Sequence, residues 1–269
     1  MRLSILYLVF FGLLFAQCRS ENVQTNTISA VTQNVIPTPE PDPIPSYIDL
    51  AFVMGKFSIQ EHNMFVRIES KYAENGNRYM HKEAYESFKK MHAAAKADGV
   101  HLIIRSAARN FDYQKRIWER KWKGNTLLEG KYNAQSKFAD PKERALAILK
   151  YSSMPSTSRH HWGTDIDINA FENSHFENGE GLKVYKWLVA NALNYGFCQP
   201  YTKKDANRPS GYEEEKWHWS YLPVANQCMQ IAEKEFKNEL VQGFLGSNQA
   251  TVIDVYTHYI RGIHKSCLD

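Results

Sequence analysis

Residues 158–169 read SRHHWGTDIDIN, and this stretch decides the fold of the 269-residue chain. From Thr164 onward polar and apolar side chains alternate, so that the isoleucines face one way and Asp165, Asp167 and Asn169 face the other. Alternation with a period of two is typical of a strand in a sheet that has one buried face. Residues 158–169 therefore predict a turn followed by a strand that carries acidic side chains on its polar face.

A second stretch, residues 216–221 (KWHWSY), alternates in the same way, with its aromatic side chains on one face and His218 and Ser220 on the other. Helical spacing and capping residues surround the two strands, which indicates an α+β fold. We expect a single domain in which helices flank a small antiparallel sheet that carries a polar cleft. The expected helices are 84–98, 110–122, 140–151, 184–195, 223–240 and 251–260, and 100–107 is expected to be a buried strand. In the first helix Ala84, Phe88, Met91 and Ala95 share one face, and Gly99 is expected to end it. Asn110 and Asp140 are expected at the starts of the next two helices.

Three side chains on these segments, His160, Asp167 and His218, form a candidate metal site. Two imidazoles and one carboxylate are a common set of protein ligands for one catalytic Zn²⁺, which leaves a fourth position for water. Gly163 lies between the first two, where a tight turn could fold His160 back toward Asp167. The spacing Ser158-x-His160-x-x-Gly163-x-x-x-Asp167 therefore favours a metal site over unrelated surface residues.

Two neighbouring residues are rival ligands. His161 follows His160 directly, so in an extended chain its side chain points the other way. Asp165 shares a face with Asp167 but lies about 7 Å along the strand, too far for both carboxylates to bind the ion together with His160. We expect Asp165 to support a ligand from behind.

Further residues could carry the chemistry of such a site. Glu215 lies three residues before His218, where a carboxylate could take a proton from an attacking water and pass it to a leaving amine. Arg109 follows the predicted strand 100–107 and could hold a carboxylate, while Gln114 follows on the next helix. For Arg105 we favour a surface salt bridge.

These residues resemble the motifs of a known family, the zinc D-alanyl-D-alanine carboxypeptidases and dipeptidases of the vancomycin-resistance type. The family belongs to a superfamily with lysostaphin-type endopeptidases and the amino-terminal domain of hedgehog proteins. Its pattern Ser-x-His-x-x-Gly-x-Ala-x-Asp is similar to residues 158–167, and its later Glu-x-x-His is similar to residues 215–218. A third family element, Tyr-Arg-Ser-x-x-x-Gln, is similar to Ala108-Arg109-Asn110 followed by Gln114. The resemblance covers about residues 79–223.

The resemblance implies roles for these residues. His160, Asp167 and His218 would bind one Zn²⁺, and Glu215 would be the general acid and base. Arg109 would steady the oxyanion or the substrate carboxylate, and Ser158 and Gln114 would help to hold the terminal carboxylate. The implied substrates are peptidoglycan stem peptides with D-amino acids. Whether the enzyme is a carboxypeptidase, dipeptidase or endopeptidase, with D,D or L,D preference, stays open.

The beginning of the chain predicts export. Residues 3–16 form an apolar run after Arg2, of the length found in signal peptides and too short to span a bilayer. We expect residues 1–17 to be a signal peptide, with Cys18 acylated as in a lipoprotein; cleavage after Ala16 is the alternative. Residues 18–46 contain five alternating prolines and are expected to be a stiff tether that holds the domain to a membrane in the cell envelope or periplasm.

Residues 47–269 are expected to form the peptidase domain, with a helical extension from about residue 224. Cys198, Cys228 and Cys267 allow one disulfide in three possible pairings. The net charge of +4 and the lack of a clustered basic stripe speak against nucleic acid as a partner. We expect a monomer. The alternative function is a non-catalytic, zinc-containing binding module similar to the hedgehog domain, although Glu215 and Arg109 favour an enzyme.

Overall fold

The computed structural model describes residues 43–268, so the predicted leader, Cys18 and the tether up to residue 42 lie outside the described residues. At its centre is an antiparallel sheet whose strands run in the order β3 (Ile104–Ser106), β4 (Asp165–Ile168), β6 (His218–Tyr221) and β5 (Phe197–Cys198). The register pairs Ile166 with Trp219 and Asp167 with His218. The two strands predicted from their alternation are therefore neighbours, and their motif residues lie side by side.

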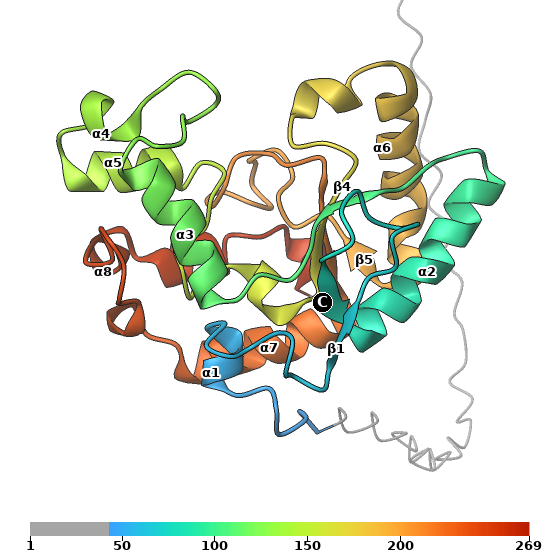
Figure 1. Ribbon diagram of the computed structural model, residues 1–269, viewed down its shortest axis with the longest axis horizontal. Coiled ribbons are helices and arrows are strands. Elements are labelled where there is room, and N and C mark those ends of the chain that lie inside the picture. Colours follow the sequence, from blue (N-terminus) through green and yellow to red (C-terminus); the bar gives the residue numbers. More distant parts are fainter. Residues whose placement is uncertain (1–42, 269) are drawn as a thin grey trace, which may run out of the picture. The chain divides into compact units, whose positions relative to one another are not determined.

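One face of this sheet is apolar and is covered by two helices, α2 (Lys82–Ala97) and α6 (Gly179–Asn191), as Figure 1 shows. The sheet contributes Ile104, Ile166, Ile168 and Trp219 to this core, all at most 3% exposed. The predicted stripe on α2 packs against them, since Ala84, Phe88, Met91 and Ala95 are fully buried. This core fixes the sheet from one side.

The second core of the domain is built largely from the remaining helices. These helices are α1 (Leu50–Val53), α3 (Phe111–Trp122), α4 (Ala134–Lys137), α5 (Pro141–Ile148), α7 (Leu222–Glu235) and α8 (Gln249–Ile253). The predicted C-terminal extension belongs to this core, because Ala250, Val255 and Ile260 are buried in it.

Local sequence signals set several of the helix boundaries. The Asn110 side chain accepts a hydrogen bond from the backbone N–H of Tyr113, and Asp140 accepts one from Glu143, so both predicted caps are confirmed. Gly99, with φ of +69°, follows α2 and ends it as expected. Helices α3 and α5 therefore begin where the sequence indicates.

Other boundaries differ from the prediction. The expected helix 223–240 ends at Glu235 and is followed by a 3₁₀ turn, Asn238–Leu240. The expected helix 251–260 is split at Asp254, whose φ is +53°, into α8 and a π turn, Tyr256–Ile260. The Asp254 carboxylate accepts a hydrogen bond from the Asn238 amide at 2.8 Å, a long-range contact that local periodicity does not reveal.

The predicted strand 100–107 is shorter than expected and comprises β3 alone. The backbone N–H of Ile103 donates to the Asn169 side chain at 2.7 Å instead of to a neighbouring strand. A separate two-stranded antiparallel sheet pairs β1 (Phe65–Arg67) with β2 (Tyr79–His81). Further 3₁₀ turns cover Arg159–Trp162, Asn173–Phe176, Ala192–Tyr195 and Lys265–Cys267.

The cysteines resolve the pairing that the sequence left open. Cys198 and Cys267 form a disulfide with Cα atoms 5.7 Å apart, and Cys228 is a buried free thiol. This bond joins the last turn of the chain to the edge strand β5. Across residues 43–268, the helices are all too short or too polar to cross a membrane.

Candidate active site

The predicted metal residues meet on the polar face of the central sheet. His160 comes from the 3₁₀ turn Arg159–Trp162, Asp167 from β4 and His218 from β6. Gly163 ends the turn with φ of +71°, and a side chain there would run into the Phe65 ring. Glycine therefore allows the tight reversal that brings His160 over Asp167.

The three side chains are close enough to share one ion. Nε2 of His160 lies 3.4 Å from Oδ2 of Asp167, and Nδ1 of His218 lies 3.1 Å from Oδ1 of the same carboxylate. One atom from each residue can be chosen so that all three lie within 4.8 Å of one another. All three residues are 3% exposed, so they are shielded from bulk water except through the cleft.

Hydrogen bonds behind the imidazoles orient them. Nδ1 of His160 donates to the Ala107 carbonyl at 2.8 Å, which leaves Nε2 with the lone pair that faces Asp167. Nε2 of His218 donates to the Asp165 carboxylate at 2.8 Å, which leaves Nδ1 facing Asp167. Such bonds on the far nitrogen fix the tautomer and rotation of a ligating histidine.

Asp165 is the centre of a buried polar network. Its carboxylate accepts hydrogen bonds from Arg159 Nε at 3.1 Å, Thr164 Oγ1 at 2.6 Å and Ser220 Oγ at 2.8 Å. Burial opposes ionisation of Asp165, but the Arg159 guanidinium and the bond from His218 outweigh it and hold the pKa of Asp165 well below its usual value. Asp165 thus holds His218 from behind, the place expected for it.

His161 lies away from the three residues. Its Nδ1 donates to the Arg109 carbonyl at 2.5 Å, and its Nε2 accepts from the Ser156 N–H at 3.1 Å. Both ring nitrogens are therefore used in fixing the backbone on which Arg109 sits. Arg105 forms a salt bridge with Glu74 at 2.6 Å, as the sequence suggested for it.

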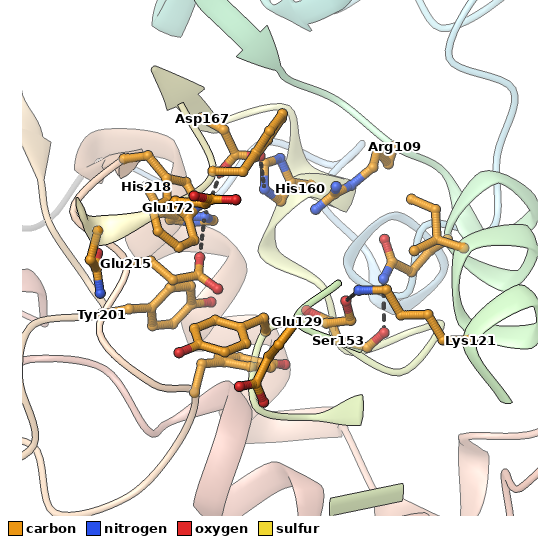
Figure 2. A pocket seen from close by; sticks show the side chains of 18 of the residues that line it. Arg109, Lys121, Glu129, Ser153, His160, Asp167, Glu172, Tyr201, Glu215 and His218 are labelled. Carbon is orange, nitrogen blue, oxygen red and sulfur yellow. Dashed lines mark hydrogen bonds and ion pairs between the residues drawn. The ribbon is translucent and has the colours of Figure 1, made fainter. Parts of the chain in front are cut away.

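Glu215 lies beside the metal residues at the wall of the cleft, as Figure 2 shows. Its Oε2 is 3.4 Å from Nδ1 of His218, and the residue is 6% exposed. Burial raises the pKa of Glu215 above its usual value, against the opposing effect of His218. A carboxylate with a raised pKa next to a reacting water is suited to accept and return a proton near neutral pH.

Electrostatics keep the acidic ligand ionised. Burial opposes the charge on Asp167, but the imidazoles of His160 and His218 hold its pKa well below the usual value. Burial and the positive charge of Arg109 lower the pKa of His160. Burial also lowers the pKa of His218, but its hydrogen bonds to Asp165, Asp167 and Glu215 raise it well above the usual value.

These donors fit Zn²⁺. Two imidazole nitrogens and one carboxylate oxygen converge, both rings are oriented by hydrogen bonds from behind, and the open side faces the cleft. The carboxylates around His218 also supply the negative charge that a divalent cation requires. The sequence, the geometry and the donor chemistry thus agree on the same three residues.

The cleft is a cavity of about 660 Å³ that extends from these residues toward α3. Arg109 and Gln114 line it, and Ser158 is buried directly before the turn that carries His160. Each of the three has a buried polar atom without a hydrogen-bond partner in the described chain: Arg109 Nε, Gln114 Oε1 and Ser158 Oγ. Buried polar atoms are usually paired, so the unpaired atoms of Arg109 and Gln114 at the cavity wall indicate a place for a ligand.

Several residues that line the cavity were not found from the sequence. Lys121 could have been found, because it follows Gln114 and Ile117 at helical spacing on the cavity face of α3. Tyr201 has no comparable sequence signal; its ring lies 4.6 Å from that of His218. Other lining residues that were missed are Glu129, Tyr151, Ser152, Ser153, Glu172, Tyr212 and Trp217.

A scan against protein families matches residues 77–224 to the family described as VanY: D-alanyl-D-alanine carboxypeptidase. This range covers more than half of the chain and contains every site residue discussed above. The chain belongs to the VanY family. The resemblance read from the motifs is therefore confirmed, and with it the α+β class with a small antiparallel sheet.

Curated relatives agree with the VanY assignment. The chain is 32% identical to a D-alanyl-D-alanine carboxypeptidase of Enterococcus faecalis over 136 residues, which cover 49% of this chain and 44% of the relative. It is 33% identical to the putative carboxypeptidase YodJ of Bacillus subtilis over 150 residues, which cover 54% and 47% of the two chains. The matched part thus spans somewhat less than half the length of these relatives.

Solved structures of similar proteins include VanYB in complex with D-alanine-D-alanine, at 24% identity and a TM-score of 0.45. That similarity covers 65% of this chain and 85% of the other. The LD-carboxypeptidase LdcB has 22% identity and a TM-score of 0.46, over 77% of this chain and 78% of the other.

Proposed function

We propose that this VanY-family chain is a zinc metallopeptidase that removes the C-terminal residue from peptidoglycan stem peptides at bonds that involve D-amino acids. The observation that carries the proposal is the convergence of His160, Asp167 and His218, with Glu215 beside them, in one cavity. The curated relatives named as carboxypeptidases support the same reaction. We expect one Zn²⁺ per chain and a monomeric protein.

Zn²⁺ held by His160, Asp167 and His218 would supply Lewis acidity, which makes a water molecule nucleophilic near neutral pH and polarises the scissile carbonyl. Glu215 accepts the proton of the attacking water and delivers it to the amine that leaves. Arg109, on the opposite side of the cavity, stabilises negative charge that develops on the substrate (Figure 2). Asp165 keeps the His218 ring in place throughout.

Recognition of the substrate is assigned to the unpaired polar atoms. The guanidinium of Arg109 can form charged hydrogen bonds with a carboxylate, and the hydroxyl of Ser158 can donate one more. The Gln114 amide is anchored by a bond from Nε2 to the Ser153 carbonyl at 2.8 Å, so its Oε1 is held in a fixed position at the cavity wall. A free C-terminal carboxylate matches the donors of Arg109 and Ser158, whereas Gln114 Oε1 accepts and is suited to an N–H of the substrate.

The proposal is tested by the substitution Glu215→Ala. We expect the variant to keep its zinc and to lose hydrolysis of defined stem peptides by about 10²–10⁴-fold, because the general acid and base is removed while the ligands stay. Zinc content is measured by metal analysis and the released amino acid by mass spectrometry. Glu213→Ala is the matched control, since Glu213 is an exposed loop residue paired with Lys204.

Four outcomes can be told apart. Loss of activity in Glu215→Ala alone supports the mechanism. Full activity in that variant contradicts the role of Glu215, and turnover that persists after removal of all metal contradicts the metal mechanism. A wild-type protein that binds zinc but cleaves no stem peptide would instead be the binding module similar to the hedgehog domain.

We also propose that the chain is exported and held in the cell envelope by a lipid on Cys18, because the apolar run 3–16 and the proline-rich segment precede the domain. Substitution Cys18→Ala should move the protein from the membrane fraction to the soluble fraction after cell fractionation. Unchanged membrane association of that variant would contradict the anchor, and the peptidase proposal would be unaffected.

A further inference from the structure

Lys121 extends the positive wall of the cavity. Gln114, Ile117 and Lys121 follow one another at steps of three and four residues, so they form one stripe along α3, and all three line the cavity. Figure 2 shows Lys121 on the same side as Arg109, across the cavity from His218 and Glu215. The cavity thus has a cationic wall on α3 and its preceding loop, and an acidic wall on the sheet.

The Lys121 ammonium lacks a carboxylate partner within the described part of the chain. Its Nζ donates to the Ser152 hydroxyl, and no Asp or Glu oxygen of residues 43–268 lies within 4.0 Å of it. Burial, together with the positive charge of Arg109, lowers the pKa of Lys121 to about 8. Lys121 is only partly buried, but its ammonium is desolvated and has no paired carboxylate among the described residues, so the cavity that it lines is matched to an anion.

A nearby lysine provides the contrast. Lys123, two residues further on, is exposed and lies 3.9 Å from Glu119, an ordinary pair of residues i and i+4. Lys121 instead points into the cavity, where water is limited and a second cation is already present. Placing two cations on one wall costs free energy in the empty protein, and a bound carboxylate would offset this cost.

We infer that Lys121 is a substrate-binding residue that, together with Arg109, holds a carboxylate of the part of the peptide that leaves. This inference rests on the proposed function and sharpens it. If the terminal carboxylate is held by both cations, the enzyme requires a free C-terminus and is a carboxypeptidase and not an endopeptidase. If a side-chain carboxylate is held, the cavity prefers an acidic last residue.

The test compares Lys121→Met with the matched control Lys123→Met on three stem peptides. One ends in free D-alanine, one ends in D-alanine amide, and one ends in D-glutamate. We expect Lys121→Met to lower kcat/KM on the D-alanine peptide by about 10–100-fold, mainly through KM, because one charged hydrogen bond is lost. On the amide the variant and the wild type should be equally slow, and Lys123→Met should match the wild type throughout.

A loss confined to the D-glutamate peptide would assign Lys121 to the side-chain carboxylate instead, and would still support carboxylate binding. Thermal unfolding separates binding from a structural role: Lys121→Met should melt at the wild-type temperature or above it, because a partly buried cation without a carboxylate partner in residues 43–268 is removed.

The inference is overturned if the variant loses activity equally on the acid and the amide, if it loses none, or if it unfolds at a clearly lower temperature. In each of these cases the wild type still cleaves, so the proposed function stands. A wild type that cleaves none of the three peptides overturns both proposals.

Discussion

The two faces of the central sheet are equally buried, but they are stabilised in different ways. On one face Ile166, Ile168 and Trp219 pack against α2 and α6. On the other face Asp165 and His218 are at most 3% exposed as well, and hydrogen bonds and ion pairs replace the apolar contacts. Burial alone therefore does not distinguish a core from a site; the way in which buried polar groups are satisfied does.

On the apolar face the loss of one contact can be partly compensated by neighbouring side chains, whereas on the polar face the loss of one hydrogen-bond or ion-pair partner cannot. A buried methyl group that is lost leaves a cavity that neighbours can partly fill. A buried charge that loses its partner keeps its full desolvation cost. We therefore expect substitutions on the polar face to lower zinc affinity and activity. Substitutions on the apolar face should lower stability and leave zinc affinity unchanged.

The largest effect is expected for Asp167→Asn on the polar face. An amide is a much weaker zinc ligand than a carboxylate, so the variant should lose stoichiometric zinc and fall in kcat/KM by about 10³-fold or more. Metal analysis and peptide hydrolysis measure both. Zinc binding at the wild-type level would show that Asp167 is not a ligand.

Asp165→Asn should act next most strongly, through stability and positioning. The substitution leaves Arg159 buried without a charged partner, which should cost about 3–5 kcal/mol of unfolding free energy. It also weakens the hydrogen bond that orients the His218 ring, because a neutral amide oxygen replaces the carboxylate, so zinc affinity should fall by about 10–100-fold. Urea unfolding and zinc titration give the two values; a change in stability without a change in affinity would contradict the positioning role.

Ile166→Ala tests the opposite face at the adjacent position. Removing a fully buried branched side chain should cost about 2–5 kcal/mol, comparable to the loss in Asp165→Asn. Zinc affinity of the folded protein should stay at the wild-type value, because the ligands are held by hydrogen bonds on the other face. A loss of zinc affinity in this variant would mean that the faces are not independent.

The smallest effect is a pH dependence confined to the polar face. The folded pKa of Asp165 is lowered, so its contribution to stability is complete above the unfolded pKa of about 4 and is lost as the pH falls through the folded pKa. The stability difference between wild type and Asp165→Asn should therefore shrink with falling pH. The deficit of Ile166→Ala should change less, and equal slopes in metal-free urea unfolding would contradict the assignment.

The contrast between the faces also explains what the sequence could predict. The alternation around Asp167 and His218 and the caps at Asn110 and Asp140 depend on neighbours in the chain, and the structure has these features as predicted. The burial of the acidic face was not foreseen, because it depends on Arg159, whose charge gave no hint of an interior position. The two-sided burial of β4 is a tertiary property.

Other features escaped prediction for the same reason. Nothing local chooses among the three cysteine pairings, and the pairing follows only from where the last turn packs. The break at Asp254 depends on Asn238, 16 residues earlier. The helical spacing of Gln114, Ile117 and Lys121 can be seen in the sequence. That this face of the helix lines the cavity is seen only in the folded structure.

The disulfide between Cys198 and Cys267 closes a covalent ring across a sequence separation of 69 residues, and both Glu215 and His218 lie inside this ring. A protease that cuts once between the two cysteines therefore cannot separate the fragments. Nicked protein would migrate as one band without reducing agent and as two bands with it, and the half that carries the second histidine would stay attached to the rest of the enzyme.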